Sequence, residues 1–129
     1  MLLTKRNEYA LQAMILLSRQ EKGNPLSASG LAKKLNTTPA FMSKIAQQLA
    51  RAGLVETVRG KRGGLMLKRP SKQITAGEIF AAVDGELVVS ACIKEGRCRH
   101  HVCPVFPVLS RMQNDLNRRL NQAKLSTFV

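Results

Sequence analysis

The stretch from residue 27 to residue 70 constrains the fold most, because signals for starting and ending helices follow one another in order. Ser27 is a residue type that caps helices, and it predicts a short helix. After a short polar turn, Thr38 predicts the cap of a second helix, with Pro39 at its first position. Gly53 predicts the end of that second helix.

A hairpin is predicted directly after these two helices. Residues 54–58 and 65–67 favour strands, and the polar, glycine-rich residues 59–64 (RGKRGG) favour the turn that joins them. Apolar positions four residues apart predict a further helix over residues 4–19, ahead of the pair, with Thr4 as its cap. Helix, short helix, turn, helix and basic hairpin is the order of a winged helix-turn-helix. The predicted fold is therefore mainly α, with a small β-hairpin wing.

The rest of the chain predicts two more helices, one near residues 74–85 and a long one from about residue 104. The long helix carries an apolar stripe that needs either a second subunit or this chain's own core to cover it. The residues of that stripe are Val105, Leu109, Met112, Leu116, Leu120 and Ala123. We expect four units: a DNA-binding domain at 1–70, a connecting helix at 71–91, a cysteine loop at 92–103, and a dimerisation helix and tail at 104–129.

Positive charge is concentrated in the first half of the chain. Residues 1–69 hold 13 Lys or Arg and 3 Asp or Glu, whereas residues 70–129 hold 8 and 5. A basic N-terminal half is typical of proteins that bind a polyanion, most often nucleic acid. A basic surface with no such partner is the alternative.

The predicted winged helix gives each candidate DNA contact a role. The second helix of the pair enters the major groove and reads bases with its first residues. The expected base-reading residues are Thr38, Ala40, Ser43, Lys44 and Gln47. In the hairpin tip, Arg59 is suited to a minor groove. The expected phosphate contacts are Lys5, Arg6, Lys61 and Arg62.

All three cysteines and both histidines lie between residues 92 and 103, in CIKEGRCRHHVC. The spacing Cys-x5-Cys-x4-Cys lacks the paired Cys-x2-Cys of a zinc ribbon, although zinc held by three cysteines and His100 or His101 stays possible. Cys92, Cys98 and Cys103 are also suited to three corners of an Fe–S cluster. Three uncoordinated thiols are the remaining reading.

Other classes of protein fit the sequence poorly. No apolar run approaches the roughly 20 residues that cross a bilayer, and the N-terminal residues lack the apolar region of a signal peptide. We therefore expect a cytoplasmic protein without a membrane partner, in a compartment where disulfides are rare. No nucleophile–base pair or phosphate-binding loop is evident, so an enzyme is not expected.

The combination of these segments resembles the Rrf2 family of bacterial transcription regulators, over nearly the whole chain. The resemblance rests on LTKRNEYAL, LAKKLNTTPAFMSKIAQQLARAGLVETVRGKRGG, ITAGEIFAAVDG and the three cysteines before the last helix. It implies a homodimer paired through that helix and bound to double-stranded DNA at a palindromic operator. In the IscR-like and NsrR-like members, it further implies an Fe–S cluster on Cys92, Cys98 and Cys103.

The fourth ligand and the type of cluster stay open. IscR-like members have a histidine three residues after the third cysteine, where this chain has Phe106. NsrR-like members use a carboxylate in the first helix of the other subunit, which Glu8 matches. His100 or His101 are weaker alternatives. The last cysteine gap is x4 rather than x5, so both [4Fe-4S] and [2Fe-2S] clusters stay in view.

The function predicted from these features is DNA-binding transcription regulation, with operator binding controlled by a cluster that senses iron–sulfur, redox or nitric oxide status. One alternative is a cluster-free winged-helix regulator with the cysteines as a thiol redox switch, or with their loop as a docking site. The other is a zinc-bearing DNA-binding module.

Overall fold

A computed structural model describes residues 3–21, 24–96 and 103–128 of the chain. The elements run in the order α1 (Lys5–Ser18), α2 (Ala28–Lys34), α3 (Pro39–Arg51), β1 (Val55–Val58), β2 (Gly64–Leu67), η1 (Ser71–Gln73), α4 (Ala76–Asp84), α5 (Ala91–Glu95), α6 (Val105–Gln122) and η2 (Leu125–Phe128). The mainly helical fold with one antiparallel hairpin is the predicted one. We call residues 5–84 the winged part, and the segment from Gly85 to Gln122 the arm.

The caps predicted for the helices of the winged part are present. The hydroxyls of Thr4, Ser27 and Thr38 each accept a hydrogen bond from a backbone N–H in the first turn of α1, α2 and α3. Pro39 lies at the start of α3, as expected. Because these groups would otherwise lack a partner within the helix, the caps fix where each helix begins.

The core of the winged part lies where α1, α2, α3 and α4 meet. Met14, Leu31, Ile45 and Ile79 are almost completely buried, one from each helix. Each such side chain contributes about 1.5–3 kcal/mol through the apolar surface it removes from water. At one side of this core, the rings of Tyr9 and Phe41 meet edge to face, with their centroids 5.5 Å apart.

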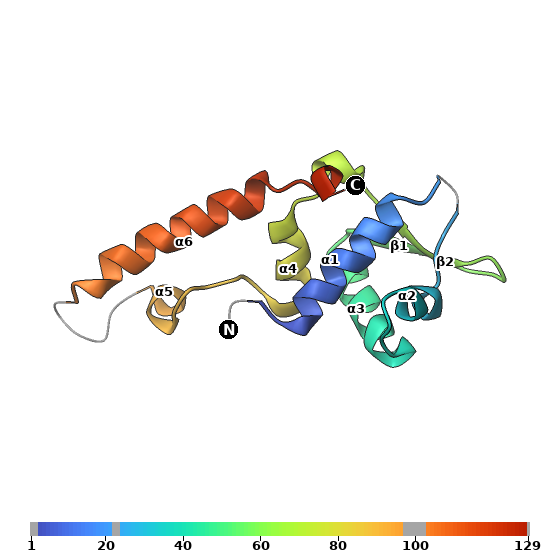
Figure 1. Cartoon of the computed structure of the whole chain (residues 1–129), viewed down its shortest axis with the longest axis horizontal. Coiled ribbons are helices and arrows are strands. Elements are labelled where there is room, and N and C mark those ends of the chain that lie inside the picture. Colours follow the sequence, from blue (N-terminus) through green and yellow to red (C-terminus); the bar gives the residue numbers. More distant parts are fainter. Residues whose placement is uncertain (1–2, 22–23, 97–102, 129) are drawn as a thin grey trace.

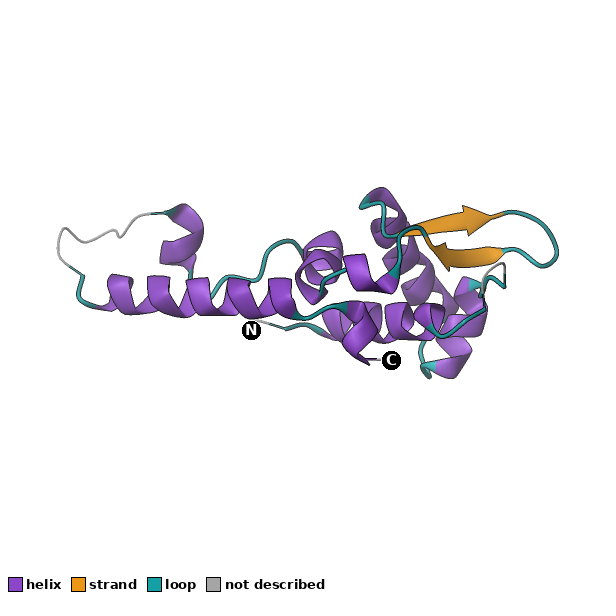
Figure 2. Ribbon diagram, turned by 90° about the horizontal axis from the view of Figure 1, so that it is seen from above, coloured by secondary structure: helices purple, strands orange, loops and turns teal. Residues whose placement is uncertain are grey.

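The hairpin is held near its turn by a third segment. Val55 pairs with Leu67 and Val58 with Gly64 in the antiparallel register, and Leu26 forms an isolated bridge with Leu65 on the other side of β2. The turn at residues 59–63 therefore extends from strands that are held on both sides of β2. It lies at one end of the molecule, and the start of α6 lies at the other (Figures 1 and 2).

The arm contains a helix that the sequence did not predict. Residues 92–103 were expected to be a loop, but Ala91–Glu95 form α5, which ends at Gly96 with φ 71°. Glycine adopts this left-handed conformation without strain, so it ends the helix. Cys92 thus lies on a helix.

The apolar stripe of α6 divides into two parts. Leu116, Leu120 and Ala123 pack against the core of the winged part. Val105 and Met112 are 53% and 52% exposed. The second half therefore folds back on this chain's own core, which was one of the two alternatives. The first half is uncovered in the single chain.

Candidate nucleic-acid interface and cysteine segment

The face of α3 that points away from the core carries the candidate base-reading residues. Met42, Ile45, Ala46 and Leu49 face the core. The predicted contacts Thr38, Ala40, Lys44 and Gln47 are exposed, and Ser43 is half-buried. The packing that holds α3 in place thus leaves these side chains toward solvent.

A groove of about 600 Å³ separates α3 from the wing. Its lining combines small side chains with polar ones: Ser27, Ala28, Ser43, Ala46, Gln47, Ala50, Arg51, Thr57, Gly63, Gly64 and Leu65. Small side chains leave room for a strand of a sugar-phosphate backbone, and Arg51 and Thr57 bring a cation and a hydroxyl to its walls.

Sequence reasoning missed Arg51 and Thr57. Arg51 lies four and eight residues after Gln47 and Ser43, so all three share one face of the helix. That spacing was a usable signal. Nothing comparable identified Thr57, because only the pairing of β1 with β2 brings it to the groove.

The glycines of the wing tip allow the chain to approach its neighbours closely. A Cβ atom at Gly63 would overlap the carbonyl oxygen of Val58, and one at Gly64 would overlap the backbone of Leu26. Arg59, Lys61 and Arg62 at the tip are all exposed. The three cations are thus presented at the far end of the hairpin, next to two glycines, Gly63 and Gly64, that cannot be replaced without a shift of the backbone.

The two cations expected at the start of α1 have partners within the chain. Lys5 lies 3.6 Å from Glu8 on the surface. Arg6 Nη1 lies 3.1 Å from Asp84 Oδ1, and the hydroxyl of Thr4 donates to the other oxygen of Asp84. Arg6 therefore joins the start of α1 to the end of α4, and a phosphate would compete with Asp84 for it.

Two of the three cysteines lie within the described residues. Cys92 on α5 and Cys103, two residues before α6, are both half-buried, and α5 packs against α6. Cys98, His100 and His101 lie outside the described residues.

Glu8 does not join these cysteines within one chain. In the part of the chain that the structure describes, no three His, Cys, Asp or Glu side chains gather closely enough to hold a metal ion. The side chain of Glu8 is 53% exposed on α1. This position leaves its carboxylate accessible to another subunit.

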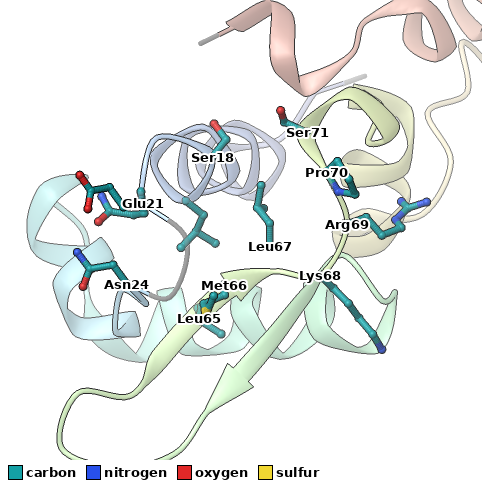
Figure 3. A pocket seen from close by; sticks show the side chains of 12 residues that line it. Ser18, Glu21, Asn24, Leu65, Met66, Leu67, Lys68, Arg69, Pro70 and Ser71 are labelled. Atoms are coloured by element: carbon teal, nitrogen blue, oxygen red, sulfur yellow. The ribbon is translucent and has the colours of Figure 1, made fainter.

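A second hollow, of about 560 Å³, lies behind the wing between the end of α1 and β2 (Figure 3). Leu17 and Leu67 contribute apolar walls, and Lys68 points away from the space. The hydroxyl of Ser18 donates to the carbonyl of Ile15 at 2.6 Å, so it is not prepared for nucleophilic attack. This hollow does not resemble an active site.

One carboxylate joins the end of the wing to α4. Glu78 accepts hydrogen bonds from the Thr75 N–H at 3.0 Å and from Arg69 at 2.9 Å, and Thr75 accepts one in return from the Glu78 N–H. Burial raises the pKa of Glu78, but the Thr75 hydrogen bond and the Arg69 guanidinium outweigh it and lower the pKa overall. The anionic form is thus part of the folded structure.

None of the described helices is long and apolar enough to cross a membrane.

Comparisons with known proteins agree with this architecture. Residues 3–129 match the Rrf2 family model, described as an iron-dependent transcriptional regulator. A putative HTH-type transcriptional regulator of Haemophilus influenzae is 28% identical over all of this chain and 87% of its own length. The HTH-type transcriptional regulator IscR of Cronobacter sakazakii is also 28% identical, over all of this chain and 80% of its own.

Among solved structures, CymR, the global cysteine regulator of Bacillus subtilis, superposes with a TM-score of 0.82. It is 24% identical, and the match covers 96% of this chain and 92% of CymR. The IscR structure from T. potens gives a TM-score of 0.77 at 21% identity, over 96% and 82%. These proteins are regulators rather than enzymes, and the chain belongs to the Rrf2 family of winged-helix transcriptional regulators.

Proposed function

We propose that this regulator is a cytoplasmic homodimer that binds a palindromic operator, and that an Fe–S cluster on Cys92, Cys98 and Cys103 controls the binding. The observation that carries the proposal is the position of Cys92 and Cys103. Both are half-buried thiols at the end of the arm where the apolar stripe of α6 is uncovered. A ligand held by these cysteines would therefore be next to the surface that we propose for dimerisation.

The DNA-binding part of the proposal is supported by the exposed face of α3 together with the wing. Lys44 and Gln47 are exposed on the helix that would enter the major groove. Lys61 and Arg62 are exposed at the wing tip, next to Gly63 and Gly64, which line the groove beside α3. Phosphate contacts from the wing would fix the register, while the helix reads the base edges.

The homodimer is supported by the first half of α6. Val105, Val108 and Met112 recur at three and four residues and are each about half exposed. A row of exposed apolar side chains along one helix is typical of an association surface. Two-fold pairing through it would give two α3 helices and therefore two operator half-sites.

The donor set is chemically suited to a cluster. Thiolates are the usual ligands of Fe–S clusters, and a bound cluster supplies iron that reacts with oxidants or nitric oxide. The exposed carboxylate of Glu8 of the partner subunit is our candidate for the fourth position. His100 and His101 are alternatives. A cluster on these cysteines would fix how α5 lies against the start of α6. Through the proposed dimer surface, it would thereby influence the spacing of the two α3 helices.

A cluster-free thiol switch is the second candidate function. The observation that favours it is the similarity to CymR. The structure of the oxidised form of Staphylococcus aureus CymR superposes on this chain with a TM-score of 0.76, at 27% identity. A zinc site is a third reading. The donor residues are the same in all three, so metal content separates them.

The test is anaerobic purification, followed by an absorption spectrum and by analysis of iron, sulfide and zinc. We expect a brown protein with iron and sulfide in stoichiometric amounts, and operator affinity that changes when the cluster is removed. A colourless protein that takes up no iron on reconstitution would reject the cluster. Stoichiometric zinc would favour the zinc site.

The fourth ligand is tested with Glu8→Gln and with Glu21→Gln as its control, since Glu21 is also an exposed acid near an end of α1. We expect Glu8→Gln alone to change the spectrum or the lifetime of the cluster in air. Identical spectra and lifetimes in the two variants would exclude Glu8 as a ligand.

A further inference from the structure

The one residue that α6 buries is polar. Gln113, in the middle of the helix, is 7% exposed, whereas the apolar Met112 beside it is 52% exposed. A glutamine is rarely buried unless its amide group is hydrogen-bonded. Its contacts therefore indicate what holds α6 at this point.

The amide of Gln113 binds a segment far away in the sequence. Its Oε1 accepts from the N–H of Val89 at 2.9 Å, and its Nε2 donates to the carbonyl of Leu87 at 2.8 Å. Nε2 also donates to Oδ1 of Asn117, one turn later, at 2.9 Å. The side chain therefore forms two hydrogen bonds to the backbone of residues 87–89, and Asn117 helps to orient it.

Residues 87–89 lead directly to the cysteine segment. Leu87 is buried in the core, and Val89 precedes Ser90, which begins the helix carrying Cys92. Upstream, Asp84 is held by Thr4 and Arg6 at the start of α1. A displacement of α5 is therefore opposed at its base by Asp84 and, through Gln113, by α6.

We propose that Gln113 is a positioning residue, which couples the position of the Cys92 helix to that of α6 through its hydrogen bonds to Leu87 and Val89. The inference rests on the proposed function in giving Cys92 a sensing role, but it concerns only residues of one chain. When α5 moves, these hydrogen bonds must move with it or break. Breaking them leaves a buried amide and two backbone groups without partners, which is unfavourable. The favourable response is for α6 to follow.

The coupling is measured without a cluster and without DNA. In a chain with Cys98→Ser and Cys103→Ser, N-ethylmaleimide adds to Cys92: a sulfur–carbon bond forms, and the thiol proton ends on the neighbouring ring carbon. Hydrogen–deuterium exchange of α6 is then compared before and after the addition, with Gln113 and with Gln113→Leu. We expect the addition to change exchange in the middle of α6 by about tenfold with Gln113, the factor that one or two ordinary hydrogen bonds represent. With Gln113→Leu we expect less than about twofold.

Two further variants separate coupling from stability. Gln122→Leu makes the same substitution at an exposed position of α6 and should keep the full response. Gln113→Glu retains an acceptor for the Val89 N–H but loses the donor to Leu87, so we expect a partial response. It also provides the test if Gln113→Leu fails to fold. A purely structural role for Gln113 would lower Tm in Gln113→Leu and leave the response to Cys92 addition unchanged.

The coupling is rejected if α6 does not respond to the addition in the Gln113 chain, or responds equally in Gln113→Leu. Operator binding, measured on the same samples, addresses the proposed function separately. A chain that binds no operator but transmits the Cys92 addition to α6 would contradict the proposed function and support the coupling. A chain that binds operator but shows no response in α6 would agree with the proposed function and contradict the coupling.

Discussion

In the winged part, each of the four helices contributes a nearly fully buried apolar side chain, whereas the arm meets that core through few such contacts. Met14, Leu31, Ile45 and Ile79 are at most 1% exposed, but the residue that α6 buries is Gln113. Apolar burial is strong and non-directional, whereas hydrogen bonds are weaker and depend on geometry. The winged part is therefore suited to a constant shape, and the arm to an adjustable one.

The difference also concerns what each region presents to partners. The winged part exposes polar and basic side chains around α3 and the hairpin tip, as a DNA-binding surface requires. The arm exposes Val105, Val108 and Met112. Regions of low local stability are the ones that usually move when a protein is regulated. We therefore expect substitutions in the winged part to reduce stability most, and substitutions in the arm to alter regulation most.

The largest expected effect is on stability. Ile45→Ala should lower the free energy of unfolding by about 2–5 kcal/mol, because it leaves a cavity in a fully buried site. Val88→Ala in the arm shortens a half-buried side chain outside the proposed interface and should cost only about 1 kcal/mol. Urea unfolding at one fixed protein concentration compares the two. Equal losses would mean that the arm is as tightly packed as the winged part.

The next effect is on association. Val108→Glu should raise the dimer Kd by about 30- to 150-fold, or 2–3 kcal/mol, because the interface would bury an unpaired carboxylate. Asn114→Glu adds the same charge at an exposed position away from the stripe and should leave the Kd nearly unchanged. Sedimentation equilibrium measures both. A Val108→Glu protein that associates normally would exclude this row of exposed apolar side chains from the interface.

A smaller effect is expected on DNA affinity. Replacing Lys61 and Arg62 together by Gln should weaken binding to operator and to unrelated DNA alike. It should reduce the slope of log K against log salt by about 1.8 for each subunit bound, or about 3.6 for the proposed dimer. Arg111→Gln removes a cation from the arm and should leave the slope unchanged. Fluorescence anisotropy over a range of salt concentrations tests this. A larger loss on operator than on unrelated DNA would instead indicate that the wing reads sequence.

The smallest effect is the dependence of stability on pH. The pKa of Glu78 is lowered in the folded state, so its contribution is present above the ordinary glutamate pKa of roughly 4.3 and is lost as pH falls through the lowered value. Glu78→Gln should therefore reduce stability at neutral pH and approach the parent protein in acid. Asp115→Asn, which breaks an exposed pair with Arg118 in the arm, should have little effect at any pH. Thermal unfolding between neutral pH and about pH 3 compares these variants.

The features that sequence predicted well are the local ones. The caps at Thr4, Ser27 and Thr38, the proline at the start of α3 and the hairpin all follow from residues close together in the chain. Their physical causes act over one turn of helix or one strand pair, so the sequence alone contains them. Family membership, predicted from the same segments, was confirmed by the match over residues 3–129.

The features that it missed depend on contacts distant in sequence. Periodicity indicated that one face of α6 is apolar, but not that Leu116 and Leu120 would be covered by the core while Val105 stays exposed. The pairing of Arg6 with Asp84 spans 78 residues, and no local pattern signals it. Gln113 resembled any polar residue of an amphipathic helix until its contacts with residues 87–89 were seen.

The end of the chain returns to the winged part and completes it. Leu125 is fully buried, its N–H donates to the carbonyl of Ile74, and the N–H of Ala76 donates to the carbonyl of Ala123. During synthesis, the ribosome must therefore make and release the arm before the last core side chain reaches its place. A nascent chain that already includes the wing and α3 still lacks that side chain. The core of the winged part thus combines side chains from both sides of the arm, so a chain that ends before Leu125 would have a gap in that core.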